Sequence, residues 1–239
     1  MKNVLRILAF ILLVISIHSC KKGNLNKMIL FNPNSTYGTV IDIDSNIYKT
    51  ITIGTQTWMA ENLKTTKYLS GDLIGTTSRL NISKESTPKY QWAYDGDEKN
   101  VVIYGRLYTW YAVTDSRHVC PIGWHVSSNN DWTTLVNFLG GVSVAIDKLK
   151  ETGTMHWISP NKGATNESGF TVLPAGSRLD KLSDFRIYTQ MGESGHFWTA
   201  TESVEDTDCA WRRLLTQDLN FHMGWAPKRI GWPVRCVKD

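Results

Sequence analysis

The first cysteine of the chain, Cys20, stands in a setting that predicts covalent attachment of lipid. It follows a basic start with Lys2 and Arg6, an apolar run over residues 7–17, and the small residue Ser19. This order is typical of a bacterial lipoprotein signal peptide that is cleaved before the cysteine. The thiol and the new amine would then carry acyl chains such as palmitate, and several chains together hold a protein durably on a bilayer.

The same apolar run could instead form a transmembrane helix. Its eleven residues are fewer than the roughly twenty that a membrane-crossing helix needs. We therefore favour cleavage, with residues 1–19 as the signal peptide and residues 20–37 as the lipidated cysteine and a flexible tether rich in turn formers. The sequence thus predicts a protein of the bacterial cell envelope that is anchored to a membrane by lipid, and we expect the outer membrane.

Three further cysteines would meet the oxidising compartment that an exported chain enters. Cys120 and Cys236 both lie among apolar and aromatic residues, and we predict a disulfide between them. Cys209 would then be a free thiol. The carboxylates of Asp206 and Asp208 beside it should raise its pKa, which disfavours a role as a nucleophile.

Other residues that could do chemistry form weak patterns. The spacing of Asp42, Asp44 and Asn46 resembles the start of a calcium loop. However, Ile47 stands where that loop needs a glycine, and Ile53 stands where it needs a glutamate. A hairpin turn explains the same three polar residues, so we expect no bound metal there.

The sequence also lacks the spacings of familiar catalytic motifs. Four of its histidines stand singly, without the spacing of a zinc site. They are His125, His156, His196 and His222. The segment 192–196 contains a serine but not the glycine spacing of a nucleophile elbow. We therefore predict no enzymatic activity and no cofactor.

Composition and charge limit the classes of partner. Removing residues 1–19 takes away Lys2 and Arg6 and lowers the formal net charge from +4 to +2. A nearly neutral domain without clusters of basic residues has no electrostatic basis for binding nucleic acid. Hydrophobic residues make up 41% of the chain and include ten tryptophans, which is enough for a sizeable core. We assign residues 38–239 to a single domain.

The hydrophobic pattern predicts an α+β domain with antiparallel strands, two or three short helices and long loops. In the first half we expect a β-hairpin over residues 40–53 and an irregular loop over 71–100. A short helix over residues 109–115 should follow, although alternation fits this region about as well.

The second half carries clearer signals. Ser128 and Asp131 form a capping box before a helix whose apolar face ends at Leu139, and a second amphipathic turn covers residues 142–149. Beyond Phe170 helix signals vanish. Short alternating runs there predict an antiparallel sheet, at residues 197–201, 210–216 and 232–237.

Five motifs stand in order along the chain. They are Thr-Gln-Thr-Trp-Met-Ala-Glu-Asn-Leu at 55–63, Tyr-Gly-Arg-Leu-Tyr-Thr-Trp-Tyr-Ala at 104–112, Cys-Pro-Ile-Gly-Trp-His-Val at 120–126, Gly-Ala-Thr-Asn-Glu-Ser-Gly-Phe at 163–170 and Val-Arg-Cys-Val at 234–237. Together they resemble the Fibrobacter succinogenes major paralogous domain family of secreted and lipid-anchored bacterial proteins. The resemblance implies a place in the envelope but no settled biochemical activity.

The layout is also similar to C-type-lectin-like domains of the formylglycine-generating-enzyme type. The shared features are a helix containing Trp110 and Tyr111, a helix entered from Ser128 through Asp131, and a last strand that approaches Arg235 through an aromatic residue. This similarity implies a C-type-lectin-like fold. In that fold the two ends of the domain meet in one small sheet, and long loops lie elsewhere.

Aromatic residues outside the expected core are the candidates for ligand binding. Tryptophans in motifs or on apolar faces should be buried, namely Trp58, Trp110, Trp124 and Trp132. The stretches 178–194 and 196–225 look loop-rich and mix aromatic rings with hydrogen-bond donors. The candidate ligand-binding residues there are Tyr188, Trp211, Arg212, Arg213, His222 and Trp225. We expect a non-catalytic domain that recognises carbohydrate; the alternatives are a structural or adhesion subunit that binds other envelope proteins and, less favoured, an enzyme.

Overall fold

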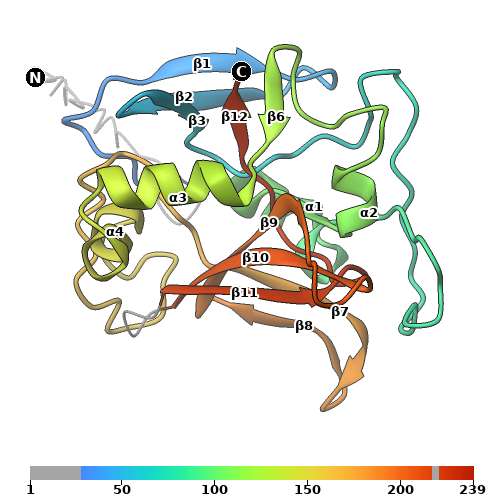
Figure 1. Ribbon diagram of the computed structural model, residues 1–239. Coiled ribbons are helices and arrows are strands. Elements are labelled where there is room, and N and C mark those ends of the chain that lie inside the picture. The colour runs from blue at the N-terminus through green and yellow to red at the C-terminus, as the bar shows by residue number, and fades with distance from the viewer. Residues whose placement is uncertain (1–27, 217–220) are drawn as a thin grey trace, which may run out of the picture.

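The computed structural model in Figure 1 describes residues 28–216 and 221–239. The predicted signal peptide, residues 1–19, the predicted lipidation site Cys20 and residues 21–27 of the predicted tether lie outside the described residues. Within the described ranges, no helix is both long enough and apolar enough to cross a membrane.

A five-stranded antiparallel sheet in these ranges joins the first strands of the domain to the last one. Its order is β1 (Gly38–Ile41), β2 (Ile47–Ile53), β3 (Gln56–Met59), β12 (Cys236–Lys238) and β6 (Trp124–Val126). The last strand lies between two earlier strands, because Val237 pairs with Trp58 of β3 and with His125 of β6. The expected meeting of both ends of the domain in one sheet is confirmed, at the top of Figure 1.

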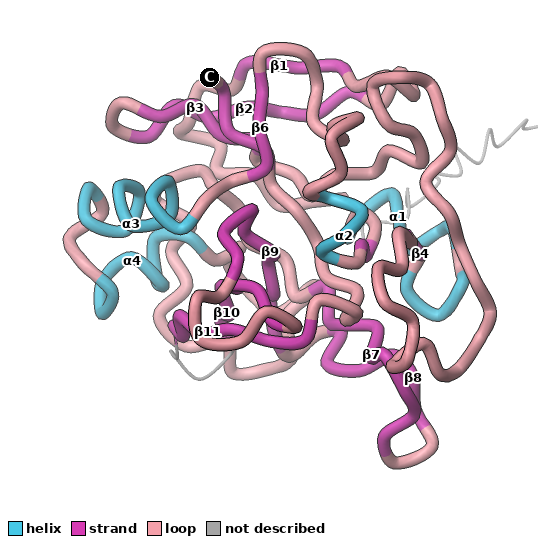
Figure 2. The backbone as a smooth tube through the Cα atoms, turned by 45° about the vertical axis from the view of Figure 1, so that its right-hand side comes forward, coloured by secondary structure: helices cyan, strands magenta, loops and turns pink. Residues whose placement is uncertain are grey.

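The other strands form smaller antiparallel sheets. They are β9 (Ser194–Glu202), β10 (Cys209–Thr216) and β11 (Phe221–Pro227) in one sheet, β7 (Ala175–Ser183) with β8 (Arg186–Met191), and β4 (Gln91–Trp92) with β5 (Leu107–Tyr108). The helices are α1 (Glu98–Tyr104), α2 (Trp110–Val113), α3 (Asn129–Phe138) and α4 (Val142–Leu149), with a 3-10 turn at Tyr94–Gly96. The α+β class is confirmed. Figure 2 shows long loops and the β7–β8 hairpin projecting from the body.

Local signals explain the elements that were predicted correctly. In the turn between β1 and β2, the Asp42 carboxylate accepts hydrogen bonds from the backbone N–H of Asn46 and from the Tyr48 hydroxyl. This is a turn stabilised by its own side chain, as predicted. At the start of α3, Ser128 Oγ accepts a bond from the N–H of Asp131, whose carboxylate accepts one from the N–H of Ser128 at 2.7 Å. The predicted capping box is therefore confirmed.

The prediction was wrong for elements that depend on pairing with strands far away in the sequence. Residues 71–100 were expected to be loop, but β4 and the first turn of α1 lie there, with Asp97 as the N-cap of the helix. The helix expected at 109–115 is shorter and covers only Trp110–Val113. The strand β5 ends just before it, and Thr109 is its N-cap residue. The strand expected over 232–237 begins only at Cys236.

The stretch 178–194 was also expected to be loop, and most of it is the β7–β8 hairpin. Its two turn residues, Asp184 and Phe185, have φ values of 48° and 62°. A two-residue hairpin turn of this kind needs positive φ at both positions and usually signals itself by a glycine or asparagine. Neither residue is present here, so no local signal marks this hairpin.

Within the part of the chain that the structure describes, the core consists of two clusters of buried side chains, and the expected tryptophans contribute to both. Trp58 and Trp132 are fully buried and pack edge to face, with ring centroids 5.1 Å apart. Trp110 and Trp124 are partly buried and pack against the other cluster, which contains Trp198. Aromatic rings therefore supply much of the apolar area that holds the sheet, the helices and the loops together.

The predicted disulfide is confirmed. It joins Cys120 to Cys236, with Cα atoms 5.9 Å apart and a sequence separation of 116. The chain-entropy model assigns a loop of this length about 5 kcal/mol of stabilisation, as an upper figure. The bond ties the last strand to the loop that precedes β6.

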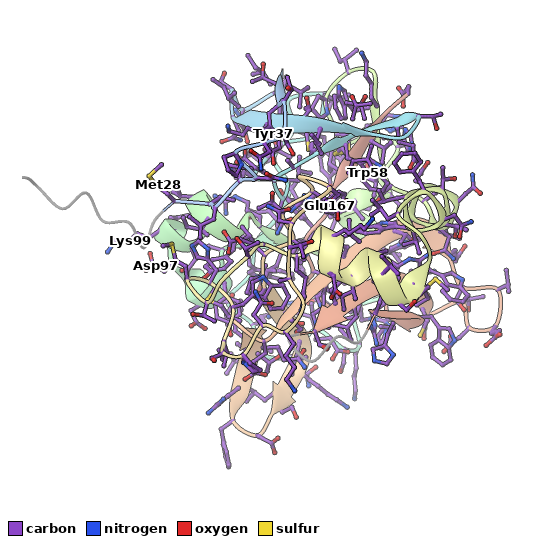
Figure 3. All side chains as sticks on the ribbon, turned by 90° about the vertical axis from the view of Figure 1, so that its left-hand side faces the viewer. Met28, Tyr37, Trp58, Asp97, Lys99 and Glu167 are labelled. Atoms are coloured by element: carbon purple, nitrogen blue, oxygen red, sulfur yellow. A yellow bond between two sulfur atoms is a disulfide. The ribbon has the colours of Figure 1, made fainter. Side chains whose placement is uncertain are left out.

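The last part of the predicted tether, residues 28–37, lies against the domain. The N–H of Leu30 donates to the Glu151 carboxylate at 2.7 Å, and the Tyr37 hydroxyl donates to the carbonyl of Gly169 at 3.0 Å. Asn32 Nδ2 donates to the carbonyl of Asn166 at 3.0 Å. Figure 3 labels Tyr37 and Glu167 in this region. Residues 28–37 are therefore part of the folded domain, and their partner is the turn over 166–169.

Candidate functional site

Two of the predicted ligand-binding residues form an exposed aromatic surface. The pairing of β10 with β11 places Trp211 directly opposite Trp225, and residues opposite one another in a sheet lie on the same face. The Trp225 side chain is 45% exposed, and Trp211 is half-buried. Met223, which is 53% exposed, follows on the same face of β11 because side chains alternate along a strand. We call Trp211, Met223 and Trp225 the tryptophan platform.

Arg213 lies beside the platform but does not offer its charge to solvent. The residue is 1% exposed, and its guanidinium donates to the carbonyls of Arg212 and Asn129, both at 3.3 Å. Burial lowers the pKa of Arg213 to about 10, so the group stays charged at neutral pH. Its prediction as a ligand-binding residue is corrected: it joins β10 to the start of α3 and supports the platform from within.

The other predicted binding residues do not join the platform. Arg212 and His222 lie on the opposite face of the sheet, because each is an odd number of positions from Trp211 or Trp225 along its strand. The Arg212 guanidinium lies 5.5 Å from the ring centroid of Trp232 in the interior. Tyr188 belongs to β8, in a different sheet. The structure thus brings together only two of the six residues.

Tyr188 contributes to a separate hollow of about 450 Å³ between the hairpin and the 3-10 turn. Trp92 forms another wall, and the Arg178 guanidinium stacks over that indole at 4.2 Å. Arg178 is 2% exposed and donates to the carbonyls of Leu179 and Arg79, and burial lowers its pKa. The charged guanidinium of Arg178 therefore holds the loop that contains Arg79 against the hairpin. Trp92 was not among the predicted binding residues, because no local pattern marks it as lining a hollow.

One serine and one histidine lie close together, but inside the fold. Ser194 Oγ and the Gln190 side-chain carbonyl are each 3.0 Å from His196 Nε2. Ser194 and His196 are 2% and 4% exposed. Burial, and secondarily the charge of Arg212, lower the pKa of His196 to about 3, so the ring is neutral. This pair is a buried polar contact that stacks on Trp232, and the hydroxyl does not face solvent.

Cys209 is also turned inward. The residue is 4% exposed, and its Sγ donates to the Asp206 carboxylate at 3.4 Å. Burial first, and then this carboxylate, raise the pKa of the thiol to about 11. The thiol is therefore protonated at neutral pH, which is the wrong state for a nucleophile. In the part of the chain that the structure describes, no group of three or more His, Cys, Asp or Glu side chains could hold a metal ion.

Comparison with known proteins gives one family. The model of the Fibrobacter succinogenes major domain matches residues 51–238, a range that contains all five sequence motifs. No match was found among curated proteins or among solved structures.

Proposed function

Because the chain belongs to the Fibrobacter succinogenes major domain family, we propose that it is an envelope protein whose non-catalytic domain binds carbohydrate through the tryptophan platform. The proposal includes lipid attachment at Cys20, a place in the outer membrane and a C-type-lectin-like arrangement of the domain. The family membership supports the envelope location. The recognition of sugar rests on the platform alone.

The single observation behind carbohydrate binding is the exposed cross-strand pair Trp211 and Trp225. A tryptophan buries roughly 150–250 Å² when it packs, so leaving one 45% exposed forgoes stabilisation that the core could have gained. Sugar rings carry an apolar face of C–H groups that stacks on such a surface.

Glycan-array binding tests this proposal, with the purified protein and three single variants. Trp225→Ala and Trp211→Ala should each weaken binding at least tenfold, about 1.4 kcal/mol. Phe185→Ala is the matched control, because that ring is 99% exposed but lies in the other hairpin. Equal circular dichroism spectra would show that all variants fold. Failure of the protein to bind any glycan, or binding that both tryptophan variants retain, would refute the assignment.

A second candidate, a subunit that binds other envelope proteins, is favoured by the β7–β8 hairpin. Among the described strands, β8 pairs only with β7 and leaves one edge without a partner strand. An exposed edge can accept a strand from another protein. Phe185 at the tip is 99% exposed. Photo-crosslinking from position 185 in intact envelopes should then capture a discrete partner, and a smear or no product would count against this function.

A further inference from the structure

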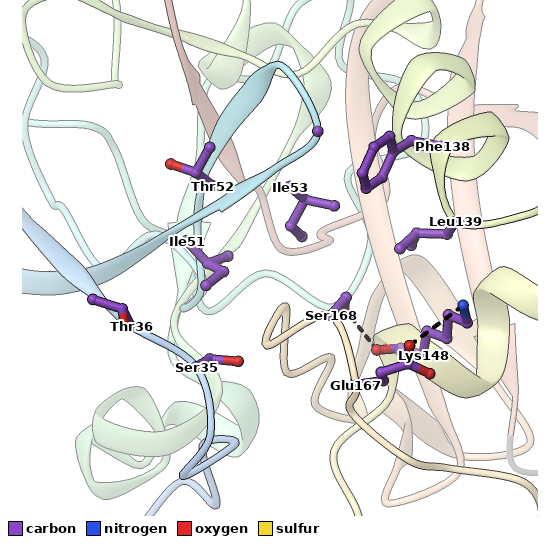
Figure 4. Close-up of a pocket in the computed structure, with 11 residues that line it drawn as sticks. Ser35, Thr36, Ile51, Thr52, Ile53, Phe138, Leu139, Lys148, Glu167 and Ser168 are labelled. Atoms are coloured by element: carbon purple, nitrogen blue, oxygen red, sulfur yellow. Dashed lines mark hydrogen bonds and ion pairs between the residues drawn. The ribbon is translucent and has the colours of Figure 1, made fainter.

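A second hollow, of about 660 Å³, lies at the end of α3 away from the platform. Figure 4 shows its walls, which come from distant parts of the chain: residues 35–36, the β2–β3 turn, the end of α3, Lys148 of α4 and the turn at 167–168. Small-molecule sites have volumes of about 300–1,000 Å³. The size of the hollow is therefore that of a site for a small ligand.

One side of the hollow is apolar. Phe138 is 63% exposed, whereas its neighbour Leu139 is 6% exposed and belongs to the core. The Phe138 ring lies against Gly54, where an added Cβ would come within 2.8 Å of a ring carbon. The absence of a side chain at Gly54 therefore makes room for the Phe138 ring. Ile51 and Ile53 line the hollow beside the ring, as Figure 4 shows, and like Leu139 they belong to the core, at 6% and 5% exposure.

The facing side is polar and carries both signs of charge. Lys148 Nζ lies 3.5 Å from Glu167 Oε1, and the two side chains are 28% and 66% exposed. Such an exposed and long ion pair contributes little to stability, so both groups keep hydrogen-bonding capacity. Ser168 Oγ donates to the carbonyl of Lys148 at 2.7 Å and fixes the turn beside the pair. The Ser35 side chain also borders this space, whereas the Thr52 hydroxyl is 3.0 Å from that of Thr57.

We propose that this hollow is a binding site for a neutral saccharide, separate from the tryptophan platform. Its apolar face would lie against the exposed Phe138 ring, and its hydroxyls would bond to Lys148 and Glu167. A ligand with a single charge would be attracted by one of these groups and repelled by the other. Hydroxyls act as donor and acceptor together, so a neutral sugar satisfies both groups and leaves the ion pair intact.

The two sites lie at opposite ends of α3. Asn129, the first residue of the helix, bonds to Arg213 beside the platform, and Phe138 is the last residue. Nine residue steps along a helix span about 14 Å. The wall at residues 35–36 also precedes the range matched by the family model, which begins at residue 51. This wall depends on the contacts that bind residues 28–37 to the turn over 166–169.

Isothermal titration with neutral disaccharides (cellobiose, xylobiose, maltose and chitobiose) tests the site. The experiment uses the purified protein and Trp225→Ala, in which the platform is impaired. We expect at least one disaccharide to bind Trp225→Ala as it binds the wild type, and Phe138→Ala and Glu167→Gln to weaken that binding at least tenfold. Val102→Ala is the control, because this exposed side chain lies on α1, away from both sites. Phe138 is already 63% exposed, so its loss should leave the fold intact, and near-ultraviolet circular dichroism checks this.

Three results would overturn the inference. The first is that no disaccharide binds Trp225→Ala, even at a concentration about ten times a Kd of 1 mM. The second is that Phe138→Ala and Glu167→Gln bind as the wild type does. The third is that glucuronic acid or glucosamine binds more tightly than the neutral sugars, which would give the site to a charged ligand. In this titration Trp225→Ala impairs only the platform, whereas Phe138→Ala and Glu167→Gln impair only the hollow. Loss of binding at one site therefore does not decide whether the other site binds sugar.

Discussion

Replacing Arg235 with methionine should destabilise the protein strongly, although the residue touches no proposed ligand. Arg235 is fully buried, and its Nε donates to the side-chain carbonyl of Asn62 at 2.9 Å. Its Nη1 donates to the carbonyls of Met59 and Phe170, and its Nη2 donates to that of Thr171 at 2.8 Å. One guanidinium thus holds the end of β3 and the segment after the 166–169 turn against the last strand.

The magnitude follows from these four bonds. Methionine fills a similar volume but leaves four acceptors without their donor, and each bond from a charged group contributes about 1.5–3 kcal/mol. Relief from burying a cation returns several kcal/mol of that loss. We therefore expect a net destabilisation of about 3–5 kcal/mol, because each of the four buried oxygens left without a donor costs about 1–3 kcal/mol. Burial lowers the pKa of Arg235 to about 9, so the side chain is still charged at neutral pH.

Equilibrium unfolding in urea measures this effect. The midpoint for Arg235→Met should fall at an unchanged slope, because the same surface is exposed on unfolding. Arg79→Met is the matched control: its side chain is 72% exposed and pairs with Glu85 at 3.3 Å, so its loss should cost less than about 1 kcal/mol. If Arg235→Met unfolds within 1 kcal/mol of the wild type, the four carbonyls do not depend on this guanidinium and the reasoning fails.

Three further predictions concern single groups. Replacing Cys120 and Cys236 with alanine should lower the free energy of unfolding by up to about 5 kcal/mol; an unchanged melting temperature would contradict this. Burial alone would raise the pKa of Asp44, but hydrogen bonds from Thr66 and the charge of Lys67 lower it to about 2. Its stabilisation is therefore present above the unfolded pKa of about 4 and is lost as pH falls toward 2, so Asp44→Asn should reduce the loss of stability over that interval. Iodoacetamide at pH 8 should label Cys209 slowly in the folded protein and rapidly in urea, since the pKa of the buried thiol is about 11; equal rates would refute its burial.

The sequence predicted features that depend on neighbours along the chain. The turn at Asp42 and the capping box of Ser128 with Asp131 use side chains that bond to backbone only a few residues away, so their residue types are sufficient signals. The burial of Trp58 and Trp132 followed from motif position and the apolar face of a helix. The pairing of Cys120 with Cys236 followed from the apolar and aromatic setting of both residues.

Only the tertiary structure separated the candidate binding residues. Arg212 and Arg213 are adjacent in an otherwise uninformative stretch, yet one stacks near Trp232 and the other bonds to the start of α3. Trp211 and Trp225 became one surface because the register of β10 with β11 sets them opposite each other.

The hollow beside Phe138 illustrates the same limit. Its walls come from residues 35–36, from the β2–β3 turn, from two helices and from the turn at 167–168, and no local pattern relates these segments. The sequence by itself determined the class of fold and the start of α3, because short-range bonding and hydrophobic periodicity set them, and the apolar setting of Cys120 and Cys236 indicated the disulfide. Strand register and burial decided which side chains face solvent together, since both depend on contacts between residues far apart in the chain.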